Sequence, residues 1–172
     1  MSERIVLALG SNLGDRAGNL RAAVALLADR GVHVLSTSSV WETAPVPAGQ
    51  PAFFNAVIAG ETVHSPESLL ATAKEVERIL GRRPNRVWGP RPADVDILFY
   101  GESRIETALL QIPHARIAER AFVLVPLSEV VRGDLPIFGA SALTLLARTD
   151  SSGIWRTGST LEPRPRSPSS AR

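Results

Sequence analysis

Residues 88–100 read Trp88-Gly89-Pro90-Arg91-Pro92-Ala93-Asp94-Val95-Asp96-Ile97-Leu98-Phe99-Tyr100. The first half is rich in glycine and proline and predicts a loop, whereas the second half is β-branched and aromatic and predicts a strand over 94–100. Because strand residues two apart share a face, one face should carry Asp94, Asp96, Leu98 and Tyr100. The opposite face should carry Val95, Ile97 and Phe99, which are all apolar and require a core.

Two carboxylates at the start of one strand face are the chemically informative feature of this stretch. Carboxylates so close together repel each other, and a shared proton or a bound divalent cation relieves the repulsion. Mg²⁺ prefers oxygen ligands and completes its shell with water and substrate phosphates. With Arg91 nearby as a fork for phosphate, we interpret this face as a site for phosphate chemistry on a metal. The structural alternative is that Asp94 ends the loop and Asp96 is solvated.

The whole chain is typical of a globular protein of one domain. It has 172 residues, of which 44% are hydrophobic and 21% charged, and it has no cysteine, which excludes a disulfide framework and thiolate metal sites. We expect a single domain over 1–150 and a tail over 151–172, disordered from about 161 because proline, serine and arginine dominate there. Because no apolar signal segment is visible, we expect a cytoplasmic protein without a membrane partner. The net charge is only +2, so we expect no nucleic-acid partner. We also expect a monomer.

The hydrophobic pattern on the N-terminal side of this stretch predicts alternating strands and helices. Expected strands are 5–9, 32–42 and 53–63, and expected helices are 15–31 and 65–80, followed by the strand at 94–100. This order predicts the split βαβ, ferredoxin-like class of α+β fold. Such a fold has an antiparallel sheet with helices mainly on one face and an open active-site face, where Asp94, Asp96, Phe53 and Asn55 could meet.

Weaker patterns follow the central strand. A small hairpin is expected near 104–106, a helix over 117–131 despite Pro126, and a short helix over 143–147. Glu77 lies beside the apolar stripe of the second helix, so it either reaches water or serves a site. The loop at 43–52 contains three prolines and is a candidate binding loop.

Several short motifs occur together in this order: Leu9-Gly10-Ser11-Asn12-Leu13-Gly14-Asp15, Gln50 with Asn55-Ala56-Val57, Glu77 with Leu80-Gly81-Arg82, Gly89-Pro90-Arg91 with Asp94-Val95-Asp96-Ile97-Leu98, and Pro113-His114 with Arg120-Ala121-Phe122-Val123-Leu124 and Pro126-Leu127. The ordered set resembles the 6-hydroxymethyl-7,8-dihydropterin pyrophosphokinase family of folate biosynthesis. The resemblance covers residues 4–130. Each motif alone is weak, but the ordered set is specific.

The resemblance implies a reaction, a co-substrate and a metal. Enzymes of this family transfer the terminal pyrophosphate of ATP to the hydroxymethyl oxygen of the reduced pterin and form AMP and the pterin diphosphate. Two Mg²⁺ ions are implied, both held by Asp94 and Asp96, in agreement with the interpretation of the carboxylate pair. The sequence contains no Gly-x-x-x-x-Gly-Lys-Ser/Thr loop, so metal and arginines must hold the phosphates.

The resemblance also assigns roles to individual residues. The catalytic set is Arg82, Arg91, Asp94 and Asp96. The ATP-binding set is Lys74, Glu77, Arg82, Trp88, Arg91, Ile97, Leu98, His114 and Arg120. The pterin-binding set is Thr43, Pro45, Phe53, Asn55, Trp88 and Phe122, with the ring between the two phenylalanines. Because the loop over 81–88 is about one residue shorter than in some relatives, a further phosphate contact could come from Arg83 or from Arg86.

Two other classes of function compete with this interpretation. A ferredoxin-like RNA-binding module would carry aromatic and basic residues on its open face, but Asp94 and Asp96 would repel a phosphate backbone there without a metal. Another metal-dependent phosphotransferase or nucleotidyltransferase would use the same carboxylate pair. The products of the reaction separate the second alternative from a pyrophosphokinase.

Overall fold

The computed structural model describes residues 1–45, 48–83 and 89–162. Its centre is an antiparallel sheet in the order β5-β1-β4-β3-β8, with β2 also pairing with β4. The strands are β1 Glu3–Ser11, β2 Val32–Thr37, β3 Trp41–Thr43, β4 Phe53–Thr62, β5 Asp94–Tyr100 and β8 Ile154–Arg156. A separate hairpin joins β6 Ile105–Glu106 to β7 Gln111–Ile112, as predicted.

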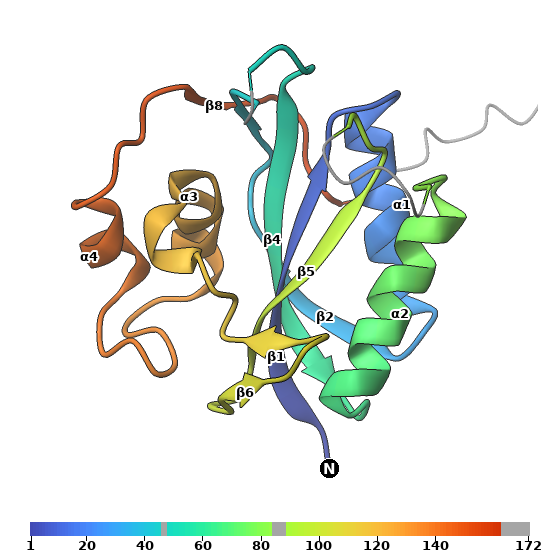
Figure 1. Cartoon of the computed structure of the whole chain (residues 1–172), viewed down its shortest axis with the longest axis vertical. Coiled ribbons are helices and arrows are strands. Elements are labelled where there is room, and N and C mark those ends of the chain that lie inside the picture. Colours follow the sequence, from blue (N-terminus) through green and yellow to red (C-terminus); the bar gives the residue numbers. More distant parts are fainter. Residues whose placement is uncertain (46–47, 84–88, 163–172) are drawn as a thin grey trace, which may run out of the picture.

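Two helices cover one face of the sheet, α1 Arg16–Ala28 and α2 Pro66–Ile79 (Figure 1). Both begin where the sequence predicts, because Asp15 and Ser65 accept hydrogen bonds from backbone N–H groups of the first turns. Gly81 follows the second helix with a φ of 100°, which favours glycine. The helices and sheet enclose a core that includes Leu7, Leu27 and Leu69, each fully buried.

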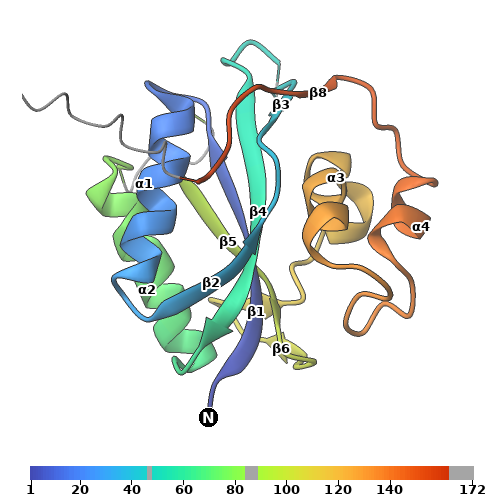
Figure 2. The same ribbon diagram turned by 180° about the vertical axis from the view of Figure 1, so that it is seen from behind.

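The other face of the sheet is partly covered by α3 Ala121–Val130, and α4 Ala142–Leu146 packs on the outer side of α3 (Figures 1 and 2). A second buried cluster lies here and includes Val57, Leu124 and Leu127. The ferredoxin-like α+β prediction is confirmed by this arrangement. The predicted helix over 117–131 is divided into a 3-10 turn, Ile117–Glu119, and α3, because Arg120 between them is extended with φ −112° and ψ 97°.

Two details of the strand predictions are wrong. The expected strand over 32–42 is two strands, because Ser38 turns inward and its Oγ accepts a hydrogen bond from the backbone N–H of Val57. Alternation along β5 also breaks, since the pairing with β1 shifts register beside Leu98 and produces a bulge. As a result Phe99 packs in the same cluster as Leu98, and Tyr100 packs with the opposite core.

The segment expected to be a tail contributes to the sheet. Residues Ile154–Arg156 form β8, which pairs with β3 along its outer edge. Leu161 is buried in the core beside α1, where Arg21 donates to the carbonyl of Thr160 at 2.9 Å. Periodicity did not reveal this strand because three residues are too few to show it. In the part of the chain that the structure describes, no helix has the length and apolar character needed to span a membrane.

Candidate active site

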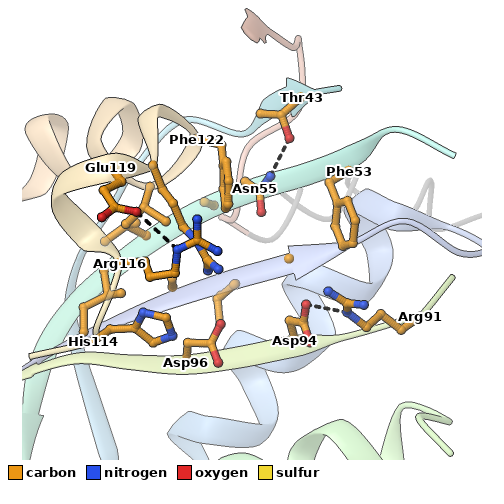
Figure 3. Close-up of a pocket in the computed structure, with 18 of the residues that line it drawn as sticks. Thr43, Phe53, Asn55, Arg91, Asp94, Asp96, His114, Arg116, Glu119 and Phe122 are labelled. Carbon is orange, nitrogen blue, oxygen red and sulfur yellow. Dashed lines mark hydrogen bonds and ion pairs between the residues drawn. The ribbon is translucent and has the colours of Figure 1, made fainter. Parts of the chain in front are cut away.

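A cavity of about 390 Å³ lies between the sheet and the start of α3 (Figure 3). Its size is within the range of small-molecule sites. Strands β4 and β5, the loop before β5, and the segment from His114 to Val123 all contribute side chains. Ten of the residues predicted from sequence line it: Thr43, Phe53, Asn55, Arg91, Asp94, Asp96, Leu98, His114, Arg120 and Phe122.

Gly10 forms part of the floor of this cavity. It lies on β1 between two chemically important neighbours, since it pairs with Asn55 of β4 on one side and with Asp94 of β5 on the other. A Cβ atom at this position would lie 3.0 Å from Oδ1 of Asn55 and 3.6 Å from the Phe53 ring. The missing side chain therefore leaves room for the Asn55 amide inside the cavity.

Two arginines bind the carboxylate of Asp94. Arg91 donates from Nε to Oδ2 at 2.6 Å, and Arg82 donates from Nη1 to Oδ1. The backbone N–H of Arg91 donates to Oδ1 of Asn12 at 2.7 Å, which fixes the loop before β5 against the end of β1. The guanidinium groups therefore already lie at the carboxylate pair, where an anionic ligand would gain charge-assisted hydrogen bonds.

Asp96 lies on the same face of β5 as Asp94 (Figure 3). Burial and, second, the neighbouring Asp94 charge raise the pKa of Asp96 above its ordinary value, although His114 lowers it. Burial lowers the pKa of His114, while Asp96 raises it. A carboxylate destabilised by a second carboxylate has a strong electrostatic reason to bind a cation.

Glu77 supports the carboxylate pair from behind. Glu77 is 3% exposed, and its side chain accepts a hydrogen bond from the backbone N–H of Val95 at 2.9 Å. Its carboxylate also lies 3.2 Å from Nη1 of Arg82 and 3.4 Å from Nζ of Lys74. Glu77 therefore does not reach water, and it contacts the backbone between Asp94 and Asp96.

Two aromatic rings face the cavity from different elements, Phe53 from β4 and Phe122 from α3, and Figure 3 shows them on either side of Asn55. The Arg91 guanidinium lies 5.0 Å from the centre of the Phe53 ring, and that of Arg120 lies 5.6 Å from the Phe122 ring. Asn55 donates from Nδ2 to Oγ1 of Thr43 at 2.7 Å, which fixes the amide plane. The arrangement can hold a flat heterocycle between rings, with an amide at its edge.

Comparison with known proteins identifies the family. Residues 6–132 match the model of the 7,8-dihydro-6-hydroxymethylpterin-pyrophosphokinase family, HPPK. The chain belongs to the HPPK family. The 2-amino-4-hydroxy-6-hydroxymethyldihydropteridine pyrophosphokinase of Methylorubrum extorquens is 42% identical over 155 residues, which cover 89% of this chain and 98% of that protein. The protein of the same name in Bacillus subtilis is 45% identical over 132 residues, 76% of this chain and 79% of that protein.

Other relatives within the HPPK family are much longer. The mitochondrial folate synthesis bifunctional protein of Pisum sativum is 42% identical over 130 residues, covering 75% of this chain but 25% of that protein. The chain thus spans about a quarter of the length of such relatives. Among solved structures, wild-type HPPK-DHPS of Plasmodium falciparum with pteroate matches 86% of this chain and 44% of that chain, with a TM-score of 0.69 and 14% identity, and so shows the same fold.

Some of the residues assigned by resemblance to HPPK lie away from the cavity wall. Lys74, Glu77 and Arg82 form a second layer behind Asp94. Ile97 is buried in the core against α1 and α2, on the face opposite Leu98. Pro45 follows Ala44, which does line the cavity. Arg83 is exposed, and Trp88 and Arg86 lie outside the described residues.

The sequence did not single out two charged residues of the cavity wall, Arg116 and Glu119, which form an ion pair with 3.3 Å between Nε and Oε2. They lie on the 3-10 turn and on the segment before it, and the prediction of one long helix did not indicate which way these side chains point. The sequence signal that could have indicated them is their closeness to His114, which they follow by two and five residues. The pair adds one positive and one negative charge to the wall near His114.

Proposed function

We propose that this chain transfers pyrophosphate from ATP to the hydroxymethyl group of 6-hydroxymethyl-7,8-dihydropterin. In this reaction the hydroxymethyl oxygen bonds to the β-phosphorus of ATP while the bond to the oxygen bridging the α and β phosphorus atoms breaks. AMP leaves with the bridging oxygen, and the pterin diphosphate forms as the hydroxyl proton is lost. Family membership and the named relatives support this assignment.

One observation carries the proposal within this molecule: an aromatic slot and a carboxylate pair open into the same cavity. The slot between Phe53 and Phe122 suits a flat pterin, and Asn55 and Thr43 suit its hydrogen-bonding edge. The carboxylate pair, with Arg91 and Arg120 close by, suits a metal-bound triphosphate. A transfer between the two substrates requires this proximity, because holding the reacting groups together supplies much of the rate.

The donor set fits Mg²⁺. Asp94 and Asp96 present carboxylate oxygens from one strand face, and in the described residues no cluster of three or more His, Cys, Asp or Glu is placed to hold a metal. Mg²⁺ commonly takes one or two carboxylates and fills its other positions with water and phosphate. We propose that Asp94 and Asp96 together hold two ions with the nucleotide. Bound there, Mg²⁺ would neutralise phosphate charge and orient the triphosphate.

The chain's own residues have three tasks in this proposal. Phe53, Phe122 and Asn55 orient the pterin so that its hydroxymethyl group reaches the carboxylate pair. Arg91, on the cavity wall, stabilises the charge that builds up on the phosphates, and Arg82 holds the Asp94 carboxylate in place from behind. His114 and Arg120 contact the nucleotide at the opposite end of the cavity wall from Arg91.

The rival functions suit this cavity less well. RNA binding is disfavoured because two carboxylates occupy the sheet face that would meet the phosphate backbone. We also propose that the chain acts as a monomer. A kinase that transfers a single phosphoryl group would use the same carboxylates but release ADP.

The deciding experiment measures AMP and ADP released from ATP by the wild type, with and without the pterin and Mg²⁺. We expect pterin-dependent AMP that disappears with EDTA and falls by at least about 100-fold in Asp96→Ala, the scale of losing electrostatic stabilisation of phosphates. Glu75→Ala removes an exposed carboxylate of α2 and serves as the control. ADP as the product, or no pterin dependence, would contradict the assignment, and full activity of Asp96→Ala would contradict the metal site.

A further inference from the structure

A carboxylate outside the cavity joins α3, which carries Phe122, to the start of β3, which pairs with β4. Glu129, in the last turn of α3, accepts hydrogen bonds from Nε1 of Trp41 at 2.6 Å and from Oγ of Ser39 at 2.7 Å. The backbone N–H of Ser39 donates to the same carboxylate at 3.3 Å. Two donors from Ser39 and one from Trp41, the first residue of β3, thus converge on one side chain of α3.

On the helix side, this contact acts on Phe122. Phe122 and Glu129 are seven residues apart, so they lie on the same face of α3, about two turns or ~10 Å from each other. Pro126 lies between them and cannot donate a hydrogen bond to the carbonyl of Phe122, which weakens the helix at that point. The orientation of Phe122 therefore depends on tertiary anchors of α3 more than it would in an uninterrupted helix.

On the sheet side, the same contact acts on the polar edge of the slot. Trp41 pairs directly with Asn55 across β3 and β4, and Thr43 shares its strand face. Thr43 is the residue that holds the Asn55 amide. Next to Ser39, the buried Ser38 accepts a hydrogen bond from the N–H of Val57, which lines the cavity. The Glu129 contact therefore lies next to the part of β3 and β4 that bears Thr43 and Asn55.

We propose that Glu129 is a positioning residue for the pterin slot, which it holds at fixed width by tying α3 to β3 through Trp41 and Ser39. This inference rests on the proposed pterin substrate. Glu129 touches neither substrate itself, and the carboxylate pair and the arginines belong to other elements, so its effect falls on pterin binding rather than on nucleotide binding.

The test measures binding of 6-hydroxymethyl-7,8-dihydropterin by calorimetry, with Mg²⁺ and α,β-methylene-ATP present, for the wild type, Glu129→Ala, Glu129→Gln and Trp41→Phe. We expect the pterin Kd to rise about threefold to tenfold in Glu129→Ala, the effect of losing charge-assisted hydrogen bonds near the surface. Glu129→Gln keeps one acceptor oxygen and should recover part of the affinity. The Kd of the nucleotide analogue should stay within about twofold of the wild type by the same reasoning.

A double variant separates positioning from a general loss of stability. If the two side chains act through their hydrogen bond, Glu129→Ala combined with Trp41→Phe should weaken pterin binding by much less than the product of the single effects. Glu75→Ala, an exposed carboxylate on α2, is the matched control. Each variant is checked by thermal unfolding.

The outcomes distinguish the two proposals. A wild type that does not bind the pterin overturns the proposed function and this inference with it. A wild type that binds the pterin, with Glu129→Ala and Trp41→Phe binding it equally well, overturns the role of Glu129 and leaves the function standing. Equal weakening of pterin and nucleotide binding, together with a lower melting temperature, shows a merely structural contact and also overturns the positioning role.

Discussion

The buried carboxylate of Glu77 accepts a hydrogen bond from the backbone N–H of Val95 at 2.9 Å. Val95 is the residue between Asp94 and Asp96, so a side chain on α2 fixes the backbone that carries the carboxylate pair. Since β5 is an edge strand of the sheet, this N–H group faces outward, away from β1. Glu77 thus replaces the missing strand partner at the position where the site needs a rigid backbone.

Replacing Glu77 by alanine should destabilise the fold. Glu77→Ala leaves the buried N–H of Val95 without its acceptor, and an unsatisfied buried donor costs about 1–3 kcal/mol. The free energy of unfolding measured in urea should fall by that amount. Glu75→Ala on the same helix removes an exposed carboxylate and should change it by less than about 0.5 kcal/mol. Equal stability of the two variants would mean that the Val95 contact contributes nothing.

Glu77 also predicts a pH dependence of stability. Burial raises the pKa of Glu77 above 4.5, so the folded state holds this proton more tightly than the unfolded chain. The stability from this group is fully present below pH 4.5 and is lost as the pH rises through the higher folded pKa. Glu77→Gln stays neutral, so its stability relative to the wild type should rise with pH across this window. Urea unfolding of both proteins between pH 4 and about 8 tests this, and a constant difference would contradict it.

Gly10 gives a prediction specific to the pterin. In Gly10→Ala the new Cβ lies 3.0 Å from Oδ1 of Asn55, whose amide is held by Thr43. The amide must move by a few tenths of an ångström, and we expect a cost near 1 kcal/mol, or about fivefold in the KM for the pterin. Gly158→Ala, where a Cβ meets nothing within 4 Å, is the control. An unchanged KM for the pterin in Gly10→Ala would place the substrate away from Asn55.

Phe122 should contribute to pterin affinity through its ring. Phe122→Ala should raise the KM for the pterin about tenfold, because it loses both the buried ring surface and the stacking geometry. The KM for ATP should change little. Phe122→Leu keeps most of the apolar volume, so the part of the loss that persists in it reports stacking. If leucine restored full pterin affinity, the slot would be merely apolar rather than a stacking site.

The turnover rate should depend on the planar shape of the Arg91 guanidinium group as well as on its charge. Arg91→Lys keeps the charge but loses the Nε group that donates to Oδ2 of Asp94. Lysine also lacks the planar pair of N–H donors with which arginine can bind two oxygens of one phosphate. We expect kcat to fall about 100-fold, the loss typical of one preorganised donor in an active site. Arg78→Lys on the exposed face of α2 should leave kcat unchanged. Steady-state assays of AMP release with both substrates saturating provide the measurement.

Much of the architecture was predictable because it rests on local signals. The strand at Asp94–Tyr100 was predicted with the observed bounds, and Ser65 and Asp15 marked the helix starts. The break near Ser38 was not predictable, because it depends on a hydrogen bond to Val57 on a strand that follows later in the chain. The bulge beside Leu98 likewise depends on pairing with β1.

The sequence predicted which residue types gather in the candidate site, but it did not predict which of them line the cavity and which lie behind its wall. The sequence indicated that Asp94 and Asp96 would share a face and would meet Phe53 and Asn55 there, and both expectations are confirmed as geometry. It could not indicate that Arg82 binds Asp94 from behind, nor that Arg116 faces the cavity. These arrangements depend on where loops and short turns direct long side chains, and no periodicity records that.

The pairing of β3 with β8 has a consequence for how the protein becomes active. Directly after β8, Thr157 donates to the carbonyl of Val40, which lies 117 residues earlier in the sequence. The strand β8 itself pairs with Trp41–Thr43 of β3. Contacts between such distant residues close large loops and form slowly. On the ribosome, β3 cannot complete its outer edge until Ile154–Arg156 have emerged. The strand that carries Thr43 is therefore among the first to be synthesised and among the last to be finished.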